Sequence, residues 1–220
     1  RRACSSPGTR NDRTHETIPV NVKSTDGLFV IDSIYLLLAR RRATIIIALT
    51  LLFIVVHLAG SAALGRGGRL MRGDARGYYI YLPSLVLDHD LDFRNDFARI
   101  NEIPLDSPLL DETPLTETGK PGNMAPIGPA FFWAPFFLIG LVAQAAFNTV
   151  VGARPLWDGY GSVAQTSVAA AGIFYAGAAA ALTARLIDRW YPPAVATGSA
   201  LAVWLATPAV YYTVVSPAYS

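Results

Sequence analysis

The sequence predicts an all-α membrane protein, a polytopic bundle of transmembrane helices with a long external loop that carries short interfacial helices. Hydrophobic residues make up 52% of the 220 residues and charged residues only 15%, whereas soluble domains carry about 25% charge. Stretches longer than the roughly 18 mainly apolar residues that cross a bilayer recur along the chain. A polar segment, residues 65–126, separates the first of these stretches from the next.

The N-terminal residues 1–39 are predicted to be a polar, disordered tail that ends in a short apolar segment. That apolar segment, residues 28–38, is too short to span a bilayer, so it either lies in the interface or extends the following helix. Residues 40–220 are predicted to form the N-terminal part of a membrane domain. Because the chain starts with Arg1 and stops just after an apolar run, we expect it to be a fragment of a longer membrane protein.

Residues 43–64 form the clearest transmembrane helix. The preceding Arg40, Arg41 and Arg42 should hold its N-terminus in the cytoplasm. A cleaved signal peptide is the alternative, but the apolar run is long for one and a long polar tail precedes it. His57 is the one ionisable residue in this helix, and it either has a functional role or faces the interface.

Two later helices are predicted over residues 163–183 and 194–214. The first is rich in alanine and glycine, which suits close packing between membrane helices. The second contains Pro208 near its end.

The apolar residues 128–150 decide the topology. If they span the membrane, Arg185 and Arg189 lie outside; if they are re-entrant or interfacial, both arginines are cytoplasmic. The positive-inside rule favours the second case, because the preceding connection holds only Arg154. Internal prolines also weaken a simple spanning helix. We therefore predict an interfacial or re-entrant segment.

The first candidate functional residue is Asp74, a few residues beyond the first helix. It is either a helix N-cap or a catalytic carboxylate, and the two roles are compatible. Spacing behind it predicts an amphipathic interfacial helix whose apolar face is Tyr78, Tyr81, Leu82 and Leu85.

A second group of candidates is acidic. Asp88, Asp90 and Asp92 would share one face of an extended chain. Their spacing excludes an EF-hand, because the required glycine and glutamate are absent. An irregular divalent-metal site with His89 or Asp74 and a solvated acidic turn both remain open. Residues 101–119 are predicted to be an irregular surface stretch.

Lys120 is the candidate cation. It either binds a phosphate as a point charge or is a solvated lysine. The aromatic residues that follow it fit an interfacial belt: Phe131, Phe132 and Trp133.

Several function classes are excluded. A net charge of +2 without a basic stripe argues against nucleic-acid binding. The lone Cys4 excludes an internal disulfide and a cysteine-based zinc site. No glycine-rich phosphate loop, nucleophile elbow or HExxH motif occurs. No nucleotide-binding domain is visible in the sequence, so if the chain is an enzyme, its activated substrate is expected to be lipid-linked already.

The order of these features resembles the GT-C superfamily of integral-membrane glycosyltransferases, in particular bacterial dolichyl-phosphate-mannose-protein mannosyltransferases and the lipid A aminoarabinose transferase. The likeness covers about residues 40–220. It rests on a G-D/E-x-x-x-Y stretch after the first helix, and on a K-P element before an aromatic-rich segment. Here these elements are Gly73, Asp74, Tyr78 with Tyr79, and Lys120 with Pro121.

The resemblance implies a sugar donor on a polyprenyl phosphate and an acceptor hydroxyl on a lipid, glycan or protein. It implies that Asp74 acts as general base or binds a catalytic metal, and that the reaction inverts the anomeric centre. Substrate contacts would come from the two tyrosines, the lysine and the acidic cluster: Tyr78, Tyr79, Lys120, Asp88, Asp90 and Asp92. It also places residues 128–150 along the outer membrane face.

The chain departs from the family where Ala75 replaces a second acid beside Asp74. The next external loop, which commonly carries another functional acid, would begin where the chain stops, so we expect the fragment to be inactive alone. A transporter or flippase subunit and a non-enzymatic assembly protein are the alternatives. A bacterial inner membrane is the expected location.

Overall fold

The computed structural model describes residues 25–64, 70–111, 114–152 and 157–219, and their regular secondary structure is helical, with no strand among them. The predicted all-α class is confirmed. Three segments are long and apolar enough to cross a membrane: Ser33–Ala63, Gly128–Val150 and Ser162–Ile187. They indicate a membrane protein. The predicted disordered tail lies mostly outside the described residues, as do Cys4 and Arg154.

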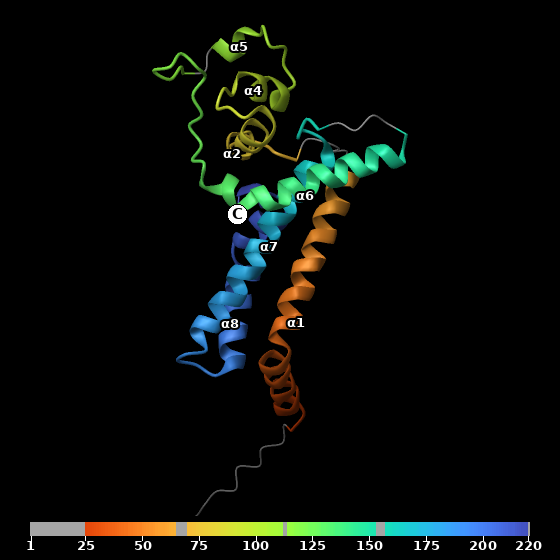
Figure 1. Cartoon of the computed structure of the whole chain (residues 1–220). Helices are drawn as coiled ribbons and strands as arrows, with labels where there is room; N and C mark the ends of the chain where they lie inside the picture. Colours follow the sequence, from red (N-terminus) through yellow and green to blue (C-terminus); the bar gives the residue numbers. More distant parts are fainter. Residues whose placement is uncertain (1–24, 65–69, 112–113, 153–156, 220) are drawn as a thin grey trace, which may run out of the picture.

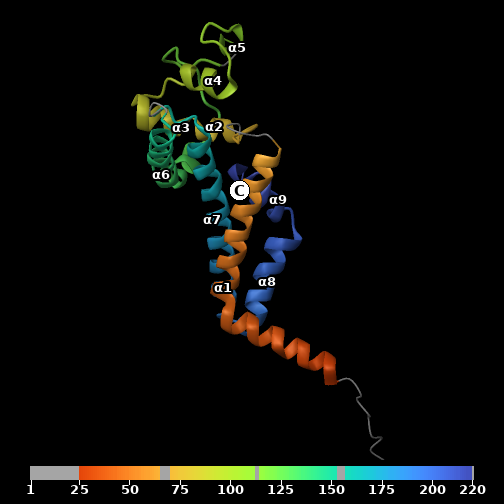
Figure 2. The ribbon, with the colours of Figure 1, turned by 90° about the vertical axis from the view of Figure 1, so that its right-hand side faces the viewer.

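The first helix, α1 (Thr25–Ala63), is longer than predicted. The apolar residues 28–38 extend it instead of forming a separate interfacial segment. The helix bends in its lower part, below the section that packs in the bundle (Figure 2). Of the two alternatives for this segment, the structure therefore has the extended helix.

A bundle forms where α1 packs on α7 (Ser162–Ile187) and α8 (Pro193–Ala206) (Figures 1 and 2). Close approach of α1 and α7 depends on Gly177, where a Cβ atom would lie 2.2 Å from the Oγ1 atom of Thr50. The ring of Phe53 packs edge-on against Trp204 of α8, with centroids 5.4 Å apart. Small residues thus let the helices approach as expected for a membrane bundle.

The prediction of a single helix over residues 194–214 is wrong. The structure has α8 ending at Ala206 and a short α9 (Ala209–Val214) after a break at Thr207. Thr207 is extended, with φ −121° and ψ 173°, because a residue that precedes proline is disfavoured in the helical region. The Oγ1 atom of Thr207 then accepts a hydrogen bond from the amide of Ala209 at 3.2 Å.

The helix α6 (Gly128–Val150) stays continuous through Pro135. It runs across the upper end of the bundle in Figure 1, whereas α1, α7 and α8 run down the picture together. It packs mainly on α7, and the contact is tight at Gly140, where a Cβ atom would lie 2.9 Å from the Cα atom of Ala164.

An ion pair joins Arg42 of α1 to Asp188, which follows α7. The basic residues that precede the apolar part of α1 and those that end α7 therefore lie at one end of the bundle. The polar loop and α6 lie at the other end (Figure 1). Because Gly128–Val150 is also long and apolar enough to cross a membrane, its interfacial or re-entrant placement stays a prediction.

The polar loop contains short helices, as predicted. They are α2 (Ala75–Tyr79), α3 (Tyr81–Pro83), a π-helix (Ser84–Asp88), α4 (Arg94–Asn101) and α5 (Pro108–Asp111). The last of these lies in the stretch predicted to be irregular. Figures 1 and 2 place α4 and α5 farthest from the bundle, with α2 nearer to α6.

The predicted apolar face of the first loop helix needs correction. Tyr79 and Ile80 are fully buried there, whereas Leu85 is exposed. The helix widens into a π-turn after Pro83, and this wider turn moves the following side chains off the regular helical spacing.

Candidate functional site

Asp74 stands at the start of α2. Gly73 precedes it with φ +52°, a conformation that glycine adopts at little cost. Asp74 occupies the N-cap position, but its backbone is helical (φ −65°, ψ −25°) and its side chain makes no capping hydrogen bond to the described amides of α2. The exposed carboxylate instead lines an open cleft of about 610 Å³.

The cleft forms where the end of the loop returns to its beginning. The side-chain amide of Asn123 donates a hydrogen bond to the carbonyl of Gly77 at 2.7 Å. The hydroxyl of Tyr81 donates one to the carbonyl of Ala125 at 2.9 Å. A Cβ atom on Gly77 would lie only 2.8 Å from the Cβ atom of Ala125. These contacts hold two distant parts of the loop together around Asp74.

The two candidate tyrosines differ. Tyr78 lines the cleft, and its ring packs edge-on against Trp133 of α6 at 6.3 Å. Tyr79 is fully buried, and its hydroxyl donates a hydrogen bond to the carbonyl of Gly159. Burial, followed by the charge of Asp158, raises the pKa of Tyr79. The predicted substrate contact therefore does not fit Tyr79, which is a core residue.

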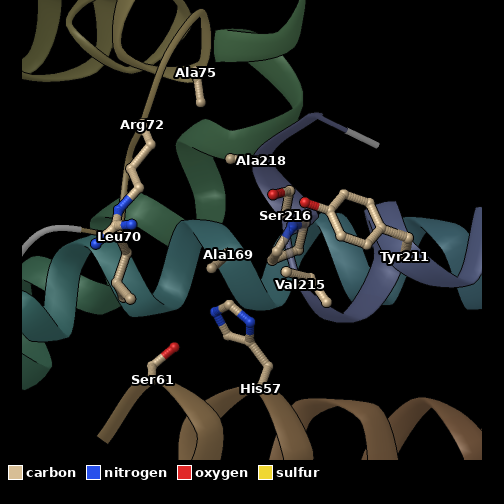
Figure 3. Close-up of a pocket in the computed structure, with 11 residues that line it drawn as sticks. His57, Ser61, Leu70, Arg72, Ala75, Ala169, Tyr211, Val215, Ser216 and Ala218 are labelled. Atoms are coloured by element: carbon tan, nitrogen blue, oxygen red, sulfur yellow. The ribbon is translucent and has the colours of Figure 1, made fainter. Parts of the chain in front are cut away.

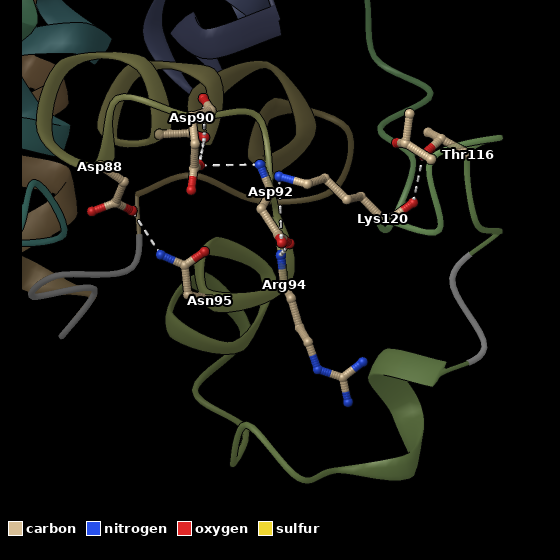
Figure 4. A network of polar contacts seen from close by, with 9 residues as sticks. Asp88, Asp90, Asp92, Arg94, Asn95, Thr116 and Lys120 are labelled. Carbon is tan, nitrogen blue, oxygen red and sulfur yellow. Dashed lines mark hydrogen bonds and ion pairs between the residues drawn. The ribbon is translucent and has the colours of Figure 1, made fainter.

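Lys120 lies beside the cleft and does not line it. Its Nζ atom is 3.7 Å from a carboxylate oxygen of Asp92 (Figure 4). Lys120 lines a neighbouring cleft of about 340 Å³. The two clefts share Gly122 and Asn123 in their walls. The lysine and Asp74 are thus on adjoining cavities, with the lysine already held by an acid.

The acidic cluster serves the loop's own structure. Asp88 accepts a hydrogen bond from the side chain of Asn95 at 2.6 Å. Asp90 accepts one from the amide of Asp92 at 3.0 Å (Figure 4). The shared face expected of an extended chain does not form, because the π-helix includes Asp88 and His89 has a left-handed backbone, with φ +58°. No group of three metal-binding side chains occurs among the described residues.

A buried carboxylate that the sequence analysis missed lies in the same loop. Asp96 of α4 is 0% exposed, and the hydroxyl of Tyr160 donates a hydrogen bond to its Oδ1 atom. Burial, with smaller contributions from the charges of Asp88 and Asp90, raises the pKa of Asp96 to about 6. No motif marks Asp96; its partner is 64 positions away.

No protein-family model matches the chain, and neither a curated protein nor a solved structure matches it. What the site can do therefore rests on its geometry. An exposed carboxylate lines a cleft that is large enough for a sugar-sized group, on the side of the bundle where α6 lies. A cation, Lys120, lies in the adjoining cleft, where it pairs with Asp92.

Proposed function

We propose that the chain is part of a membrane glycosyltransferase that moves a sugar from a polyprenyl-phosphate donor to an acceptor hydroxyl on the external face, with inversion. The observation that carries the proposal is the position of Asp74. Its carboxylate lines a cleft of about 610 Å³ built by the two ends of the loop, and the wall residue Tyr78 contacts α6. A substrate held by its lipid in the bilayer can reach such a cleft from the side.

The chemistry follows from the carboxylate. Asp74 takes the proton of the acceptor hydroxyl as its oxygen attacks the anomeric carbon. The bond between that carbon and the phosphate oxygen breaks on the opposite face, and the polyprenyl phosphate leaves with the electron pair. Attack opposite the leaving group inverts the anomeric centre. Asp74 is also the residue that would hold a divalent metal if the reaction uses one.

Lys120 is the proposed partner of the leaving phosphate. A positive charge there stabilises the negative charge that develops on the phosphate oxygens. The lysine pairs with Asp92, so this role requires the ammonium group to exchange one acidic partner for another. Tyr78 is the proposed aromatic contact for the sugar, because it lines the cleft beside Asp74.

The proposed location is a bacterial inner membrane with the N-terminus of α1 in the cytoplasm. Arg40, Arg41 and Arg42 lie at the same end of the bundle as Asp188, which follows Arg185. Arginines on one side of a bundle are typical of the cytoplasmic side.

The test is transfer of radiolabelled sugar in membranes that carry the parent protein expected from the sequence analysis. Polyprenyl-phosphate sugars are compared with nucleotide sugars as donors. We expect transfer from a lipid-linked donor and its loss in an Asp74→Asn variant that reaches the membrane normally. Transfer from neither donor class would favour the transporter and assembly alternatives.

A further inference from the structure

A second cavity lies inside the molecule, on the other side of the segment that carries Asp74. It is a partly enclosed space of about 170 Å³ between α1, α7, the start of the polar loop, and α9 with the residues that follow it (Figure 3). A water molecule needs only about 15 Å³ of such space. The cavity therefore has room for a polyatomic group.

His57 of α1 forms the floor of this cavity. Its side chain is only 7% exposed. Its Nδ1 atom lies 2.8 Å from the carbonyl oxygen of Val214, and because a carbonyl only accepts, Nδ1 carries the proton. The Nε2 atom has no hydrogen-bond partner among the described residues, and it points into the cavity (Figure 3). His57 is thus not an interfacial side chain, and a buried nitrogen without a partner is costly.

The rest of the lining mixes apolar side chains with polar groups and one positive charge. Arg72 lines the same space from the loop side, with its guanidinium group beside Leu70 (Figure 3). Hydroxyl groups come from Ser61, Tyr211 and Ser216. No carboxylate is present among the described residues that line the cavity. A cation and hydrogen-bonding groups without an acid favour an anion.

We propose that this cavity binds a single phosphate group through His57 and Arg72. Phosphate suits the imidazole in either protonation state. A phosphate monoester has its second ionisation near pH 6, so it can donate a P–OH hydrogen to a neutral Nε2 atom or accept from a charged one. A carboxylate or sulfate at neutral pH only accepts. Arg72 adds charge-assisted hydrogen bonds to the phosphate oxygens.

Two sources of phosphate share this chemistry, a lipid headgroup and free phosphate. The cavity is lined by Arg72 and Ala75, and the cleft of the proposed reaction by Gly73 and Asp74. The short segment 72–75 therefore contributes residues to both the cavity and the cleft. The binding proposal does not depend on the proposed transferase function, because it concerns a separate cavity and is tested without sugar transfer.

The experiment measures binding to the purified chain in detergent. The probes are radiolabelled inorganic phosphate and geranyl monophosphate; inorganic sulfate and geraniol are the matched competitors. The variants are His57→Phe and Arg72→Gln. Arg72 is exposed, which makes its variant the safer one for folding. Arg189→Gln is the control, because Arg189 is exposed near the opposite end of the bundle.

We expect saturable binding of at least one phosphate probe, and a loss of affinity of about tenfold or more in both cavity variants. The control should bind like the unmodified chain, and sulfate should compete less well than phosphate. Binding of geranyl monophosphate alone would identify a lipid headgroup as the source. Equal binding of both probes would identify free phosphate.

The proposal is overturned if neither phosphate probe binds saturably, if both cavity variants bind normally, or if geraniol competes as well as its phosphate. Sugar transfer by the parent protein together with absent phosphate binding would remove this proposal and keep the transferase function. Phosphate binding without sugar transfer would keep this proposal and remove the transferase function.

Discussion

The hydroxyl of Tyr160 donates a hydrogen bond to the buried carboxylate of Asp96. This contact joins α4 in the polar loop to the residues just before α7. The guanidinium group of Arg99 lies over the Tyr160 ring, 5.8 Å from its centroid. The loop is therefore attached to the bundle through a protonatable group, which predicts a stability that depends on pH.

Burial raises the pKa of Asp96 from 3.8 to about 6 in the folded chain. Between these pH values the folded carboxyl keeps a proton that the unfolded chain has lost. The free energy of unfolding therefore decreases as the pH rises from about 4 to about 6. Across this range the free energy of unfolding of the unmodified chain should fall by up to about 3 kcal/mol relative to that of Asp96→Asn, which cannot ionise at position 96. Unfolding in detergent as a function of pH checks this; parallel curves for the two proteins would contradict it.

The α6–α7 contact predicts that Gly140→Ala is destabilising. The added Cβ atom would lie 2.8 Å from the Oγ atom of Ser167 and 2.9 Å from the backbone of Ala164. We expect the free energy of unfolding to fall by about 1–3 kcal/mol, which is typical when a side chain is added to a tightly packed contact. The matched control is Gly128→Ala in the same helix, where a Cβ atom meets nothing within 4 Å. Equal melting temperatures for the two variants would show that α6 does not pack closely on α7.

The ion pair of Arg42 and Asp188 predicts a measurable coupling between α1 and α7. Their side chains are 36% and 20% exposed, so water screens the pair only partly. A double-mutant cycle with Arg42→Gln and Asp188→Asn should give a coupling free energy of about 0.5–1 kcal/mol. The exposed pair Arg94 and Asp111 is the control, and its coupling should be smaller. A coupling near zero for the first pair would show that it does not stabilise the contact between α1 and the end of α7.

The arrangement of α6 predicts which residues lie on which side of the membrane. In a Cys4→Ser background, Met124→Cys lies in the loop and is 92% exposed, whereas Arg189→Cys follows α7. A membrane-impermeant thiol reagent should label position 124 in intact cells and position 189 only after permeabilisation. Labelling of both positions in intact cells would mean that α6 crosses the membrane.

The sequence predicted the helical class because apolar length and composition decide it. Two predictions failed, and one buried residue was missed, where local geometry or distant contacts decide the outcome. The break at Thr207 lies directly before Pro208, where the helical region is disfavoured. The side chains after Pro83 follow a π-turn instead of the regular helical spacing. Asp96 sits in a polar stretch without a motif, and only its contact with Tyr160 makes it distinctive.

The candidate site was predicted in part for similar reasons. Asp74 is exposed in a cleft, as a catalytic residue requires, because a glycine turn and a helix start fix its position locally. Tyr79 is adjacent to Tyr78 in the sequence, yet it points into the core. Which of two neighbouring tyrosines lines the cleft depends on helix rotation against α6, and sequence spacing alone does not determine that rotation.

The most direct test of the central claim is the initial rate of sugar transfer from a polyprenyl-phosphate donor by the parent protein and by its Asp74→Asn variant. Asp106→Asn is the matched control, because Asp106 is an exposed acid of the same loop that does not line the cleft. A general base predicts a loss of at least about 100-fold in the Asp74 variant, at equal membrane levels. The control should keep the full rate. Transfer by Asp74→Asn at the rate of the unmodified protein would contradict the account.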